Sequence, residues 1–393
     1  MAINLMVEAV ILSVYIEDCQ IVNSHTLHAI MIVLSMVILG IETSCDETSA
    51  AIITGQDDRV HLLANVISSS VALHGETGGI IPEQAAREQI KYILPVITQA
   101  LTEAKCTLAD IDALAVTYGP GLIGSLLVGV ETVKTIGYAL QKPIIPVNHM
   151  IGHIYANWID PKETIAFPAI ALVVSGGHTD LLLLKNHGDF QLLGGTRDDA
   201  AGECFDKCAR LLGYAYPGGP HISKLAVHGN EKAFPFPRPM LGEKNYEFSF
   251  SGLKTAFLNT TKKHFPLLRT TVQNTTSGWD QIPLTDTLSE KETKVRADLC
   301  ASLQRAIVDV LILKTIKAAN QYQVASIVLS GGVSANQLLR TSIAQEAKER
   351  NMRLYIPDPI LCTDNAGMIA SAAYFNNNIQ NWESITADPE LYF

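Results

Sequence analysis

The sequence is poor in positive charge. Its 29 Lys and Arg residues are outnumbered by 39 Asp and Glu, which gives a formal net charge of −10. Because nucleic-acid phosphates are bound by clustered Lys and Arg, an acidic protein does not attract RNA or DNA by its overall charge. If this protein acts on a nucleic acid, the contact needs a local basic strip or a partner protein.

The N-terminal part lacks basic residues altogether. No Lys or Arg precedes Arg59, whereas secretory signals begin with a basic region and mitochondrial presequences are rich in Arg. The apolar stretch from Ala29 to Ile41 is shorter than the roughly 20 residues that a membrane-spanning helix needs. We therefore predict no interaction with a membrane, and we expect residues 1–35 to form an N-terminal extension outside the fold.

The seven cysteines lack the paired spacing of a zinc knuckle or a redox-active CxxC motif. Cys204 and Cys208 are four positions apart, which would place them on one face of a helix, and small buried thiols are the simplest interpretation. An odd, scattered set of cysteines is typical of a reducing compartment. The composition therefore predicts a cytoplasmic protein.

Strands alternate with helices along the chain, and the same order occurs twice. Residues 37–53 and 169–184 each contain an apolar run, a polar turn and a second apolar run, which predicts a β-hairpin. Residues 111–140 and 325–350 each predict a strand, a glycine turn and a helix. We therefore expect an α/β protein with a duplicated fold, in which two lobes face each other across a ligand cleft.

The same pattern predicts the domain organisation. The N-terminal lobe is expected to span residues 36–150 and the C-terminal lobe residues 151–375, followed by a tail at 376–393. Residues 264–292 are rich in Thr, Ser, Asn and Asp and contain two prolines, which interrupts the alternation of strands and helices. This composition predicts a surface insertion within the C-terminal lobe.

Two glycine turns follow apolar strands, at Ser-Gly-Gly sequences in 175–177 and 330–332. Glycine lets the backbone approach a ligand and offers amide donors to phosphate oxygens, and the second turn opens a helix whose N-terminus favours an anion. No Gly-Lys-Ser/Thr follows either turn, so neither is a Walker loop. Nucleotide binding is the favoured hypothesis, and an ordinary tight turn is the alternative.

A histidine pair indicates a metal site. His149 and His153 are four positions apart, so both imidazoles can lie on one face of a helix and ligate one ion. Zinc proteases carry Glu directly after the first His as general base, and Met150 stands there instead. Asp364 begins a predicted helix and is a candidate third ligand, with helix N-capping as the alternative. Two histidines and a carboxylate leave coordination positions open for a substrate.

Acidic residues gather at the start of another predicted helix. Asp198, Asp199 and Glu203 suit the positive end of a helix dipole, which is their simplest explanation. Asp206 lies further along the same helix and is a candidate to bond a ribose hydroxyl. Seven basic residues nearby in the sequence form a candidate strip for nucleic-acid phosphates, with a solvated surface as the alternative: Lys232, Arg238, Lys244, Lys254, Lys262, Lys263 and Arg269.

Over residues 37–375 the chain resembles the TsaD family of tRNA threonylcarbamoyladenosine transferases, formerly described as O-sialoglycoprotein endopeptidases. The resemblance implies the actin/Hsp70/sugar-kinase (ASKHA) fold. It also implies transfer of threonylcarbamoyl from threonylcarbamoyl-AMP to the exocyclic amine of the adenosine 3′ of the anticodon, in tRNAs reading codons that begin with A. The motifs that carry it are IETSCDET at 41–48, GPGLIG at 119–124, His149 with His153, SGGHT at 175–179, YPGGP at 216–220, FSFSGLK at 248–254 and CTDN at 362–365.

The resemblance further implies site residues and partners. One divalent metal, iron in preference to zinc, would be held by His149, His153 and Asp364, and no other catalytic residue is assigned. The partners implied are tRNA, a TsaB-like scaffold, a TsaE-like ATPase and the enzyme that makes threonylcarbamoyl-AMP. The nucleotide substrate would be bound by Val173, Val174, Ser175, Gly176, Gly177, Asp206, Gly219 and Asn336.

Three positions depart from the family pattern. Gln89 stands where His is usual, Ile151 where Glu is common, and Ala366-Gly367 reverses the usual order. None removes a proposed ligand, although the first two are expected to alter tRNA contacts, partner contacts or tuning of the metal. A metallopeptidase, a kinase or ATPase of the same fold, and a non-catalytic scaffold stay as alternative functions, because a fold alone does not choose among them.

Overall fold

The computed structural model describes residues 35–70, 80–265 and 289–393. The predicted extension 1–35 therefore lies almost wholly outside the described residues, as does most of the predicted insertion 264–292. The ends of that insertion belong to helices, since His264 closes one helix and Glu290 opens another. Within the described residues, Val37–Phe393 form one compact unit that contains both sheets.

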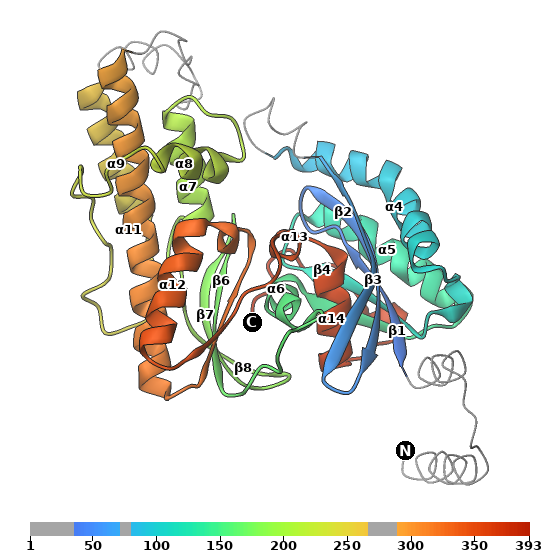
Figure 1. The fold of residues 1–393 in the computed structure, drawn as a ribbon. Helices are drawn as coiled ribbons and strands as arrows, with labels where there is room; N and C mark the ends of the chain where they lie inside the picture. The colour runs from blue at the N-terminus through green and yellow to red at the C-terminus, as the bar shows by residue number, and fades with distance from the viewer. Residues whose placement is uncertain (1–34, 71–79, 266–288) are drawn as a thin grey trace. The chain divides into compact units, whose positions relative to one another are not determined.

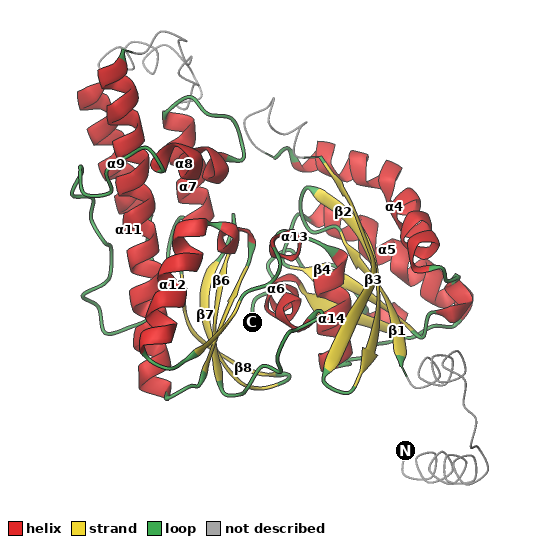
Figure 2. Ribbon diagram, viewed as in Figure 1, coloured by secondary structure: helices red, strands yellow, loops and turns green. Residues whose placement is uncertain are grey.

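The first sheet has five strands; they belong to the blue-to-teal part of the chain in Figure 1 and are drawn as yellow arrows in Figure 2. Its central strand β1 pairs in parallel with β4, and β4 pairs in parallel with β5. On the other side lies β2, which pairs antiparallel with β3. In spatial order the strands are β3 (Arg59–Ser69), β2 (Glu47–Gln56), β1 (Met36–Glu42), β4 (Ala113–Gly119) and β5 (Ile144–Asn148).

The second sheet repeats this plan strand for strand. Its central strand β6 pairs in parallel with β9 and antiparallel with β7, while β9 pairs in parallel with β10 and β7 antiparallel with β8. The duplicated two-lobe α/β fold predicted from the sequence is thereby confirmed, although strands β3 and β8 were not foreseen. The strands are β8 (Asp189–Gly195), β7 (Thr179–Asn186), β6 (Ala169–Val174), β9 (Ser326–Ser330) and β10 (Arg353–Tyr355).

Three helices pack on the first sheet and complete the N-terminal half of the fold. Helices α4 (Pro82–Ala104) and α5 (Ile123–Leu140) contact β2 and β4, and α14 (Ala366–Asn376) also contacts β2. The approach of α14 needs Gly40 in β1, because a Cβ atom there would lie 2.5 Å from the carbonyl oxygen of Ala366. A late segment therefore packs on the early sheet, and the lobe boundaries at 150/151 and 375/376 stay a prediction.

Helix α5 is long and apolar enough to cross a membrane by length and composition, the one helix in the described ranges of which this holds. Its residues Leu126, Val130 and Val133 are fully buried, and the helix packs on β4 and α4. Burial against a sheet demands the same apolar composition that a membrane span does. The packing of α5 within the first half therefore accounts for its hydropathy.

The second half is covered by α7 and α8, which contact each other, and by the long helix α11, which contacts α8, α9, α12 and β6. Helix α11 begins with a capping box between Ser289 and Glu292. These helices are α7 (Ala201–Leu211), α8 (Gly218–Ala226), α9 (Ser251–His264), α11 (Glu290–Tyr322) and α12 (Gln337–Glu349), and the short ones are η1 (Leu108–Asp110), η2 (Ala156–Trp158), η3 (Gly332–Ala335), α13 (Pro359–Cys362) and η4 (Trp382–Ser384).

The short helix α6 (His149–Tyr155) lies where the two halves meet. It follows β5 of the first sheet directly and contacts β6 and β9 of the second sheet as well as α14. Just beyond it, the amide of Asn157 donates a hydrogen bond to the carbonyl oxygen of Leu329 in β9. Side chains on α6 are therefore within reach of both sheets, whereas a ligand cleft between the lobes stays a prediction.

Candidate metal centre and nucleotide-binding turns

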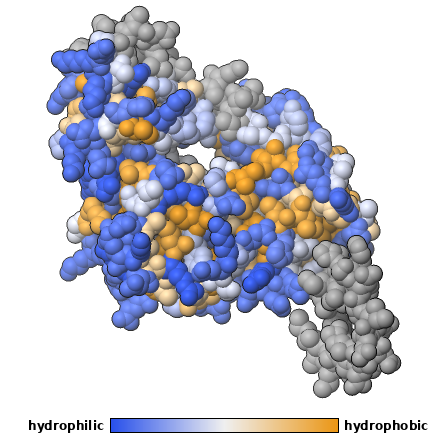
Figure 3. All heavy atoms as spheres, viewed as in Figure 1, coloured by the Kyte–Doolittle hydropathy of each residue, from blue (hydrophilic) through white to orange (hydrophobic). Residues whose placement is uncertain are grey.

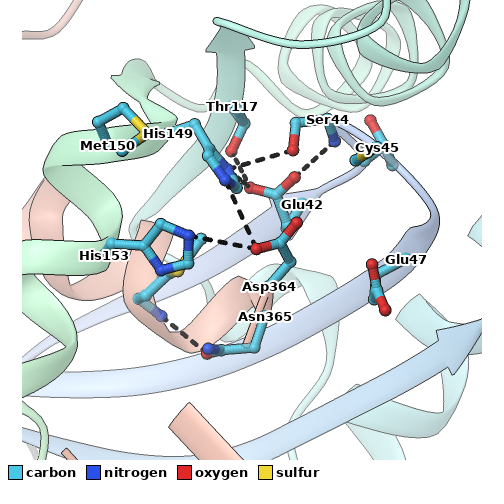
Figure 4. Close-up of polar contacts among 12 residues, drawn as sticks. Glu42, Ser44, Cys45, Glu47, Thr117, His149, Met150, His153, Asp364 and Asn365 are labelled. Atoms are coloured by element: carbon cyan, nitrogen blue, oxygen red, sulfur yellow. Dashed lines mark hydrogen bonds and ion pairs between the residues drawn. The ribbon is translucent and has the colours of Figure 1, made fainter. Parts of the chain in front are cut away.

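The predicted histidine pair lies on α6 (Figure 4). The side chain of Asn148 caps this helix by accepting the amide N–H groups of Met150 at 2.8 Å and Ile151 at 3.3 Å. One helical turn separates His149 from His153, and their ring centroids are 4.7 Å apart. The prediction that both imidazoles share one helix face is confirmed.

Asp364 completes the group. Its Oδ1 atom lies 3.5 Å from Nε2 of His149 and 3.2 Å from Nε2 of His153. The cap of α14 is formed by Asn365, whose Oδ1 accepts the amide of Met368 at 3.0 Å. The alternative interpretation of Asp364 as a helix N-cap is therefore wrong, because the cap lies one residue further on and leaves the Asp364 carboxylate free to face the histidines.

The three side chains fit a divalent transition metal. Their ligand atoms lie within 4.8 Å of one another, and two imidazole nitrogens with one carboxylate oxygen form a common donor set for zinc or non-haem iron. His153 is fully buried; among the described residues its Nδ1 has no hydrogen-bond partner, and its Nε2 faces the carboxylate of Asp364. An imidazole nitrogen and a carboxylate oxygen both carry lone pairs, so they face each other favourably only with a proton or a cation between them, and a bound cation would satisfy both.

Electrostatics favour the same conclusion. Burial by itself lowers the pKa of His149, but the carboxylates of Glu42 and Asp364 raise that pKa to about 9. Burial likewise raises the pKa of Asp364, but His149 and His153 hold it well below its usual range. The site therefore holds two carboxylates in their charged form and stabilises positive charge between them.

Glu42 is a site residue that the sequence analysis did not single out. It is the last residue of β1 and fully buried, and its Oε2 lies 3.0 Å from Nδ1 of His149. Ser44 Oγ lies 3.2 Å from the same nitrogen. The signal in the sequence was a carboxylate at the end of the apolar run 37–41, since a buried acid needs a partner.

Gln89 holds the turn between β1 and β2 in place. It lies on α4 with 1% of its surface exposed, and its Nε2 contacts the carbonyl oxygens of Thr43 at 3.2 Å, Cys45 at 3.0 Å and Glu47 at 3.1 Å. A side chain buried in this way does not reach tRNA or a partner protein. The departure from the family pattern at Gln89 therefore affects the turn beside Glu42. The second departing residue, Ile151, is partly exposed on α6.

A second acidic group shares Asp364. Carboxylate oxygens of Asp46, Glu47 and Asp364 also lie within 4.8 Å of one another. Burial, a hydrogen bond that protonated Glu47 donates to Asp46 and the charge of Asp364 raise the pKa of Glu47 to about 10. Burial and the neighbouring carboxylates thus both favour the protonated form of Glu47.

The first predicted nucleotide-binding turn connects β6 to β7. Val173 and Val174 end β6, and the main-chain carbonyl of Ser175 accepts the amide of Gly202 at the start of α7. A Cβ atom added at Gly176 or Gly177 would meet nothing within 4 Å. These two glycines are therefore not required by packing, and they leave space above an exposed turn.

Asp206, Gly219 and Asn336 meet around helix α8. Asp206 Oδ1 accepts the amides of Gly218 at 2.7 Å and Gly219 at 3.3 Å, and burial raises the pKa of this carboxyl. Asn336 donates from Nδ2 to Ser223 of α8 at 2.9 Å and caps α12 through Oδ1. The structure thus brings these three predicted residues to one helix, while their contact with a nucleotide stays a prediction.

The acidic residues before α7 serve another helix. Asp198 Oδ1 accepts the amides of Phe250 at 2.8 Å and Ser251 at 3.2 Å, so it caps α9 rather than interacting with the dipole of α7. Asp199 forms ion pairs with Lys207 at 2.7 Å and Lys254 at 2.6 Å. The dipole explanation is therefore wrong for Asp198, and Lys254 is committed to a partner within the protein.

The predicted basic strip is only partly available. Arg238 forms an ion pair with Asp309 at 2.8 Å. Two residues of the strip, Lys254 and Arg238, are therefore already paired with carboxylates of the protein. Lys262 and Lys263 lie in the last turn of α9, where cations interact favourably with the helix dipole. Arg269 lies outside the described residues, so the strip as a whole stays a prediction centred on the end of α9.

Comparison with known proteins gives a consistent result. The sequence profile of the family described as "TsaD: tRNA N6-adenosine threonylcarbamoyltransferase" matches residues 61–371. The chain is 45% identical over 356 residues to the tRNA N6-adenosine threonylcarbamoyltransferase of Moorella thermoacetica, covering 90% of this chain and 96% of that protein. It is 48% identical over 340 residues to the protein of that name from Symbiobacterium thermophilum, covering 86% of this chain and 91% of the relative.

Solved structures resemble the fold at low sequence identity. HypF from T. kodakarensis matches 86% of this chain with a TM-score of 0.53 and 15% identity, although this chain spans 47% of that protein. Full-length HypF in its phosphate- and nucleotide-bound form matches 87% of this chain and 55% of its own length, with a TM-score of 0.54 and 13% identity. At this identity the likeness shows a shared fold.

Proposed function

The chain belongs to the TsaD family and is a tRNA N6-adenosine threonylcarbamoyltransferase, and we propose that it takes the acyl group from threonylcarbamoyl-AMP beside a metal held by His149, His153 and Asp364. The acceptor is the exocyclic amine of the adenosine 3′ of the anticodon in tRNAs reading codons that begin with A. The observation that carries the metal assignment is that Nε2 of His149 and Nε2 of the fully buried His153 both face Oδ1 of Asp364, at 3.5 Å and 3.2 Å.

The metal site serves the acyl donor. Its two imidazoles and one carboxylate suit iron or zinc, and the proposed ion is iron. When bound, the ion supplies a Lewis acid and a template for the oxygens of the carbamoyl-phosphate anhydride. Within the protein, α6 and the start of α14 hold the three ligands, and the Asn148 and Asn365 caps fix these two helix starts.

The proposed role of the turn at 175–177 is to bind the AMP part of the donor. Gly176 and Gly177 face open space, so phosphate oxygens can approach their backbone closely. The proposed nucleotide contacts also include Val173 and Val174 before the turn and Asp206, Gly219 and Asn336 around α8. Holding the donor in this way supplies proximity, which is a large part of catalysis for two reactants that must meet in one orientation.

The chemistry of the acceptor explains why an activated donor is needed. The exocyclic amine of adenine is conjugated with the ring and is a weak nucleophile, so the carbonyl that it attacks needs a good leaving group. A mixed anhydride supplies AMP as that leaving group, and the amine proton can pass to the departing phosphate. No side chain is therefore assigned as general base.

Proteolysis by the zinc-protease mechanism is disfavoured at this site. The position directly after His149, where that mechanism requires a glutamate, is occupied by Met150, which is 1% exposed. A thioether cannot accept a proton from a metal-bound water. Family membership and this substitution therefore favour acyl transfer over the peptidase alternative.

We further propose that the TsaB-like scaffold docks on α4 and α5. These helices lie side by side, since a Cβ atom at Gly124 would lie 3.3 Å from that of Ala86. On their outer faces Ile90 is 65% exposed, Leu94 64% and Leu127 43%. Hydrophobic residues form part of the molecular surface drawn in Figure 3. Groups of neighbouring exposed hydrophobic side chains mark protein interfaces. A TsaE-like ATPase is the third component that the family implies.

Docking can be tested by co-purification. Ile90→Asp with Leu127→Asp should abolish capture of the scaffold and leave Zn²⁺ binding unchanged, because both side chains are exposed on the outer faces of their helices and neither is a proposed metal ligand. Undiminished capture by this variant would place the scaffold elsewhere. The acidic net charge makes such a partner important, because the proposed tRNA contacts at Lys262 and Lys263 are few.

The decisive experiment for the proposed function is transfer of radiolabelled threonine to an unmodified tRNA reading codons that begin with A, with ATP, bicarbonate and active partner proteins. Incorporation should require this chain and be lost in His149→Ala. Incorporation that survives the substitution would leave the transferase intact and contradict the metal assignment. Absence of incorporation with the wild-type chain would favour a scaffold or ATPase instead.

A further inference from the structure

Glu42 is a fully buried acid that contacts a proposed metal ligand without being one itself. Its Oε2 atom lies 3.0 Å from Nδ1 of His149, the ring nitrogen that faces away from Asp364 (Figure 4). Glu42 ends β1, and His149 follows β5, with β4 between these strands in the sheet. The contact therefore crosses the sheet and does not arise from neighbouring sequence.

The carboxylate of Glu42 is held by the protein on both oxygens. The backbone N–H of Ser44 donates to Oε1 at 2.5 Å, and the hydroxyl of Thr117 in β4 donates to Oε2 at 2.5 Å. Hydrogen bonds to a charged acceptor are strong, so the buried carboxylate cannot rotate without losing one of these two bonds. Its orientation is thus fixed before any ligand binds.

A fixed carboxylate decides which nitrogen of His149 keeps its hydrogen when a metal binds. An ionised glutamate only accepts hydrogen bonds, so Nδ1 of His149 must be the donor. Ser44 Oγ, at 3.2 Å, is a second acceptor for the same N–H group. With Nδ1 committed, Nε2 is the nitrogen that remains for a metal, and it faces Asp364 at 3.5 Å.

We propose that Glu42 is a positioning residue, which fixes the tautomer and ring orientation of His149 so that Nε2 is presented to the metal. Metal-binding histidines commonly donate their other N–H to a carboxylate, which also strengthens them as ligands. The inference rests on the proposed metal site. His153 lacks an equivalent partner among the described residues, since its Nδ1 is buried without a hydrogen bond. His149 is therefore the pre-oriented ligand of the pair.

The test is a double-mutant cycle read out as Zn²⁺ affinity, measured by competition with a chromophoric chelator on the full chain. Glu42→Gln keeps the shape of the side chain but removes its charge, and we expect about a 10- to 100-fold loss of affinity. His149→Ala removes the ring through which Glu42 acts. Adding Glu42→Gln to His149→Ala should therefore change the affinity by less than about twofold, because the effects of coupled residues do not add.

Three results separate the possibilities. Equal losses from Glu42→Gln in both backgrounds, or no loss in the wild-type background, would overturn the positioning role. Unchanged Zn²⁺ affinity in His149→Ala would instead contradict the metal site, and with it the proposed function of His149. If Glu42→Gln does not fold, Thr117→Val decides: it keeps the charge of Glu42 but removes one of its donors, and we expect about a threefold loss that disappears in the His149→Ala background. Wild-type affinity in Thr117→Val would then reject the proposal.

Discussion

Oδ1 of Asp364 lies 3.2 Å from Nε2 of His153, although the two residues come from different helices at distant points of the chain. His153 has no exposed surface, and its other ring nitrogen, Nδ1, makes no hydrogen bond to any described residue. The burial of Nδ1 is thus a cost that the folded protein alone does not recover. We therefore expect His153 to contribute to metal binding and not to the stability of the metal-free protein.

Replacing His153 with Leu should therefore have different effects on the two properties. The variant replaces an unpartnered buried Nδ1 with an apolar side chain, and Asp364, which loses its contact with His153, keeps the one with His149, so we expect the free energy of unfolding of the metal-free protein to change by less than about 1 kcal/mol. Zn²⁺ affinity should fall by at least about 100-fold, because one of three ligands is lost. Urea unfolding in the presence of a chelator and a chelator competition assay measure the two quantities. A metal-free variant destabilised by several kcal/mol would show that His153 has a structural role.

Two glycines in the two Ser-Gly-Gly turns should respond differently to alanine. A Cβ atom at Gly177 would meet nothing within 4 Å, so Gly177→Ala should leave stability unchanged or raise it by about 0.4–1 kcal/mol. Gly331 has φ +85° and ψ 163°, a region that side chains avoid, and its Cβ would lie 2.4 Å from the carbonyl oxygen of Val174. Gly331→Ala should therefore cost about 3 kcal/mol.

Calorimetric titration with AMP shows whether the space at Gly177 is used. The added methyl group of Gly177→Ala would occupy the volume proposed for the nucleotide, and we expect about tenfold weaker binding at unchanged stability. Wild-type affinity in this variant would mean that the nucleotide does not approach the turn. Gly331→Ala serves as the contrasting case, in which any loss of binding is accompanied by loss of stability.

Gln89 should contribute to stability through the turn between β1 and β2. Its amide contacts the carbonyl oxygens of Thr43, Cys45 and Glu47, so Gln89→Leu leaves buried acceptors without a donor and should destabilise the protein by about 1–3 kcal/mol. Gln99→Leu on the exposed face of the same helix is the matched control, with an expected change within about 0.5 kcal/mol. Similar values of the free energy of unfolding for both variants would contradict this role.

The sequence predicted the local features of the site and not its long-range contacts. The spacing of His149 and His153 follows from helical periodicity, so their shared face was predictable from six residues of sequence. The partner of His149 was not, because Glu42 reaches it across three strands and no local pattern encodes that contact. The family resemblance named Asp364 as a ligand, whereas local reasoning also allowed it to be a helix cap.

The same division holds for the fold. Hairpins and strand–turn–helix units have strong periodic signals, and these elements lie where the sequence predicted them. The packing of α14 on the first sheet was not predictable, since it depends on Gly40 leaving room for Ala366. The ion pair of Arg238 with Asp309 was missed for a similar reason: charge counted along the sequence does not show which charges are already neutralised in space.

His187 should make stability depend on pH. Its ring stacks on Phe375 with centroids 4.3 Å apart, and its Nδ1 lies 3.1 Å from the hydroxyl of Tyr155. Burial lowers the pKa of His187 below its ordinary value near 6.5, which the charge of Asp58 offsets only in part. The folded protein therefore binds this proton less readily than the unfolded chain does. Its contribution to stability is complete above pH 6.5 and is lost progressively as the pH falls below that value.

Comparison with His187→Phe isolates this effect from the other titrating groups. Phenylalanine keeps the aromatic stack but does not titrate, so the free energy of unfolding of the variant should fall less between pH 7.5 and pH 5 than that of the wild type. The variant loses the hydrogen bond to Tyr155, which lowers its free energy of unfolding by about 1 kcal/mol at pH 7.5. The difference between the two proteins should thus narrow on acidification. A difference that stays constant or widens would mean that His187 accepts its proton at least as easily in the folded state as in the unfolded chain. Burial of His187 in the aromatic stack would then not be the cause of the acid sensitivity.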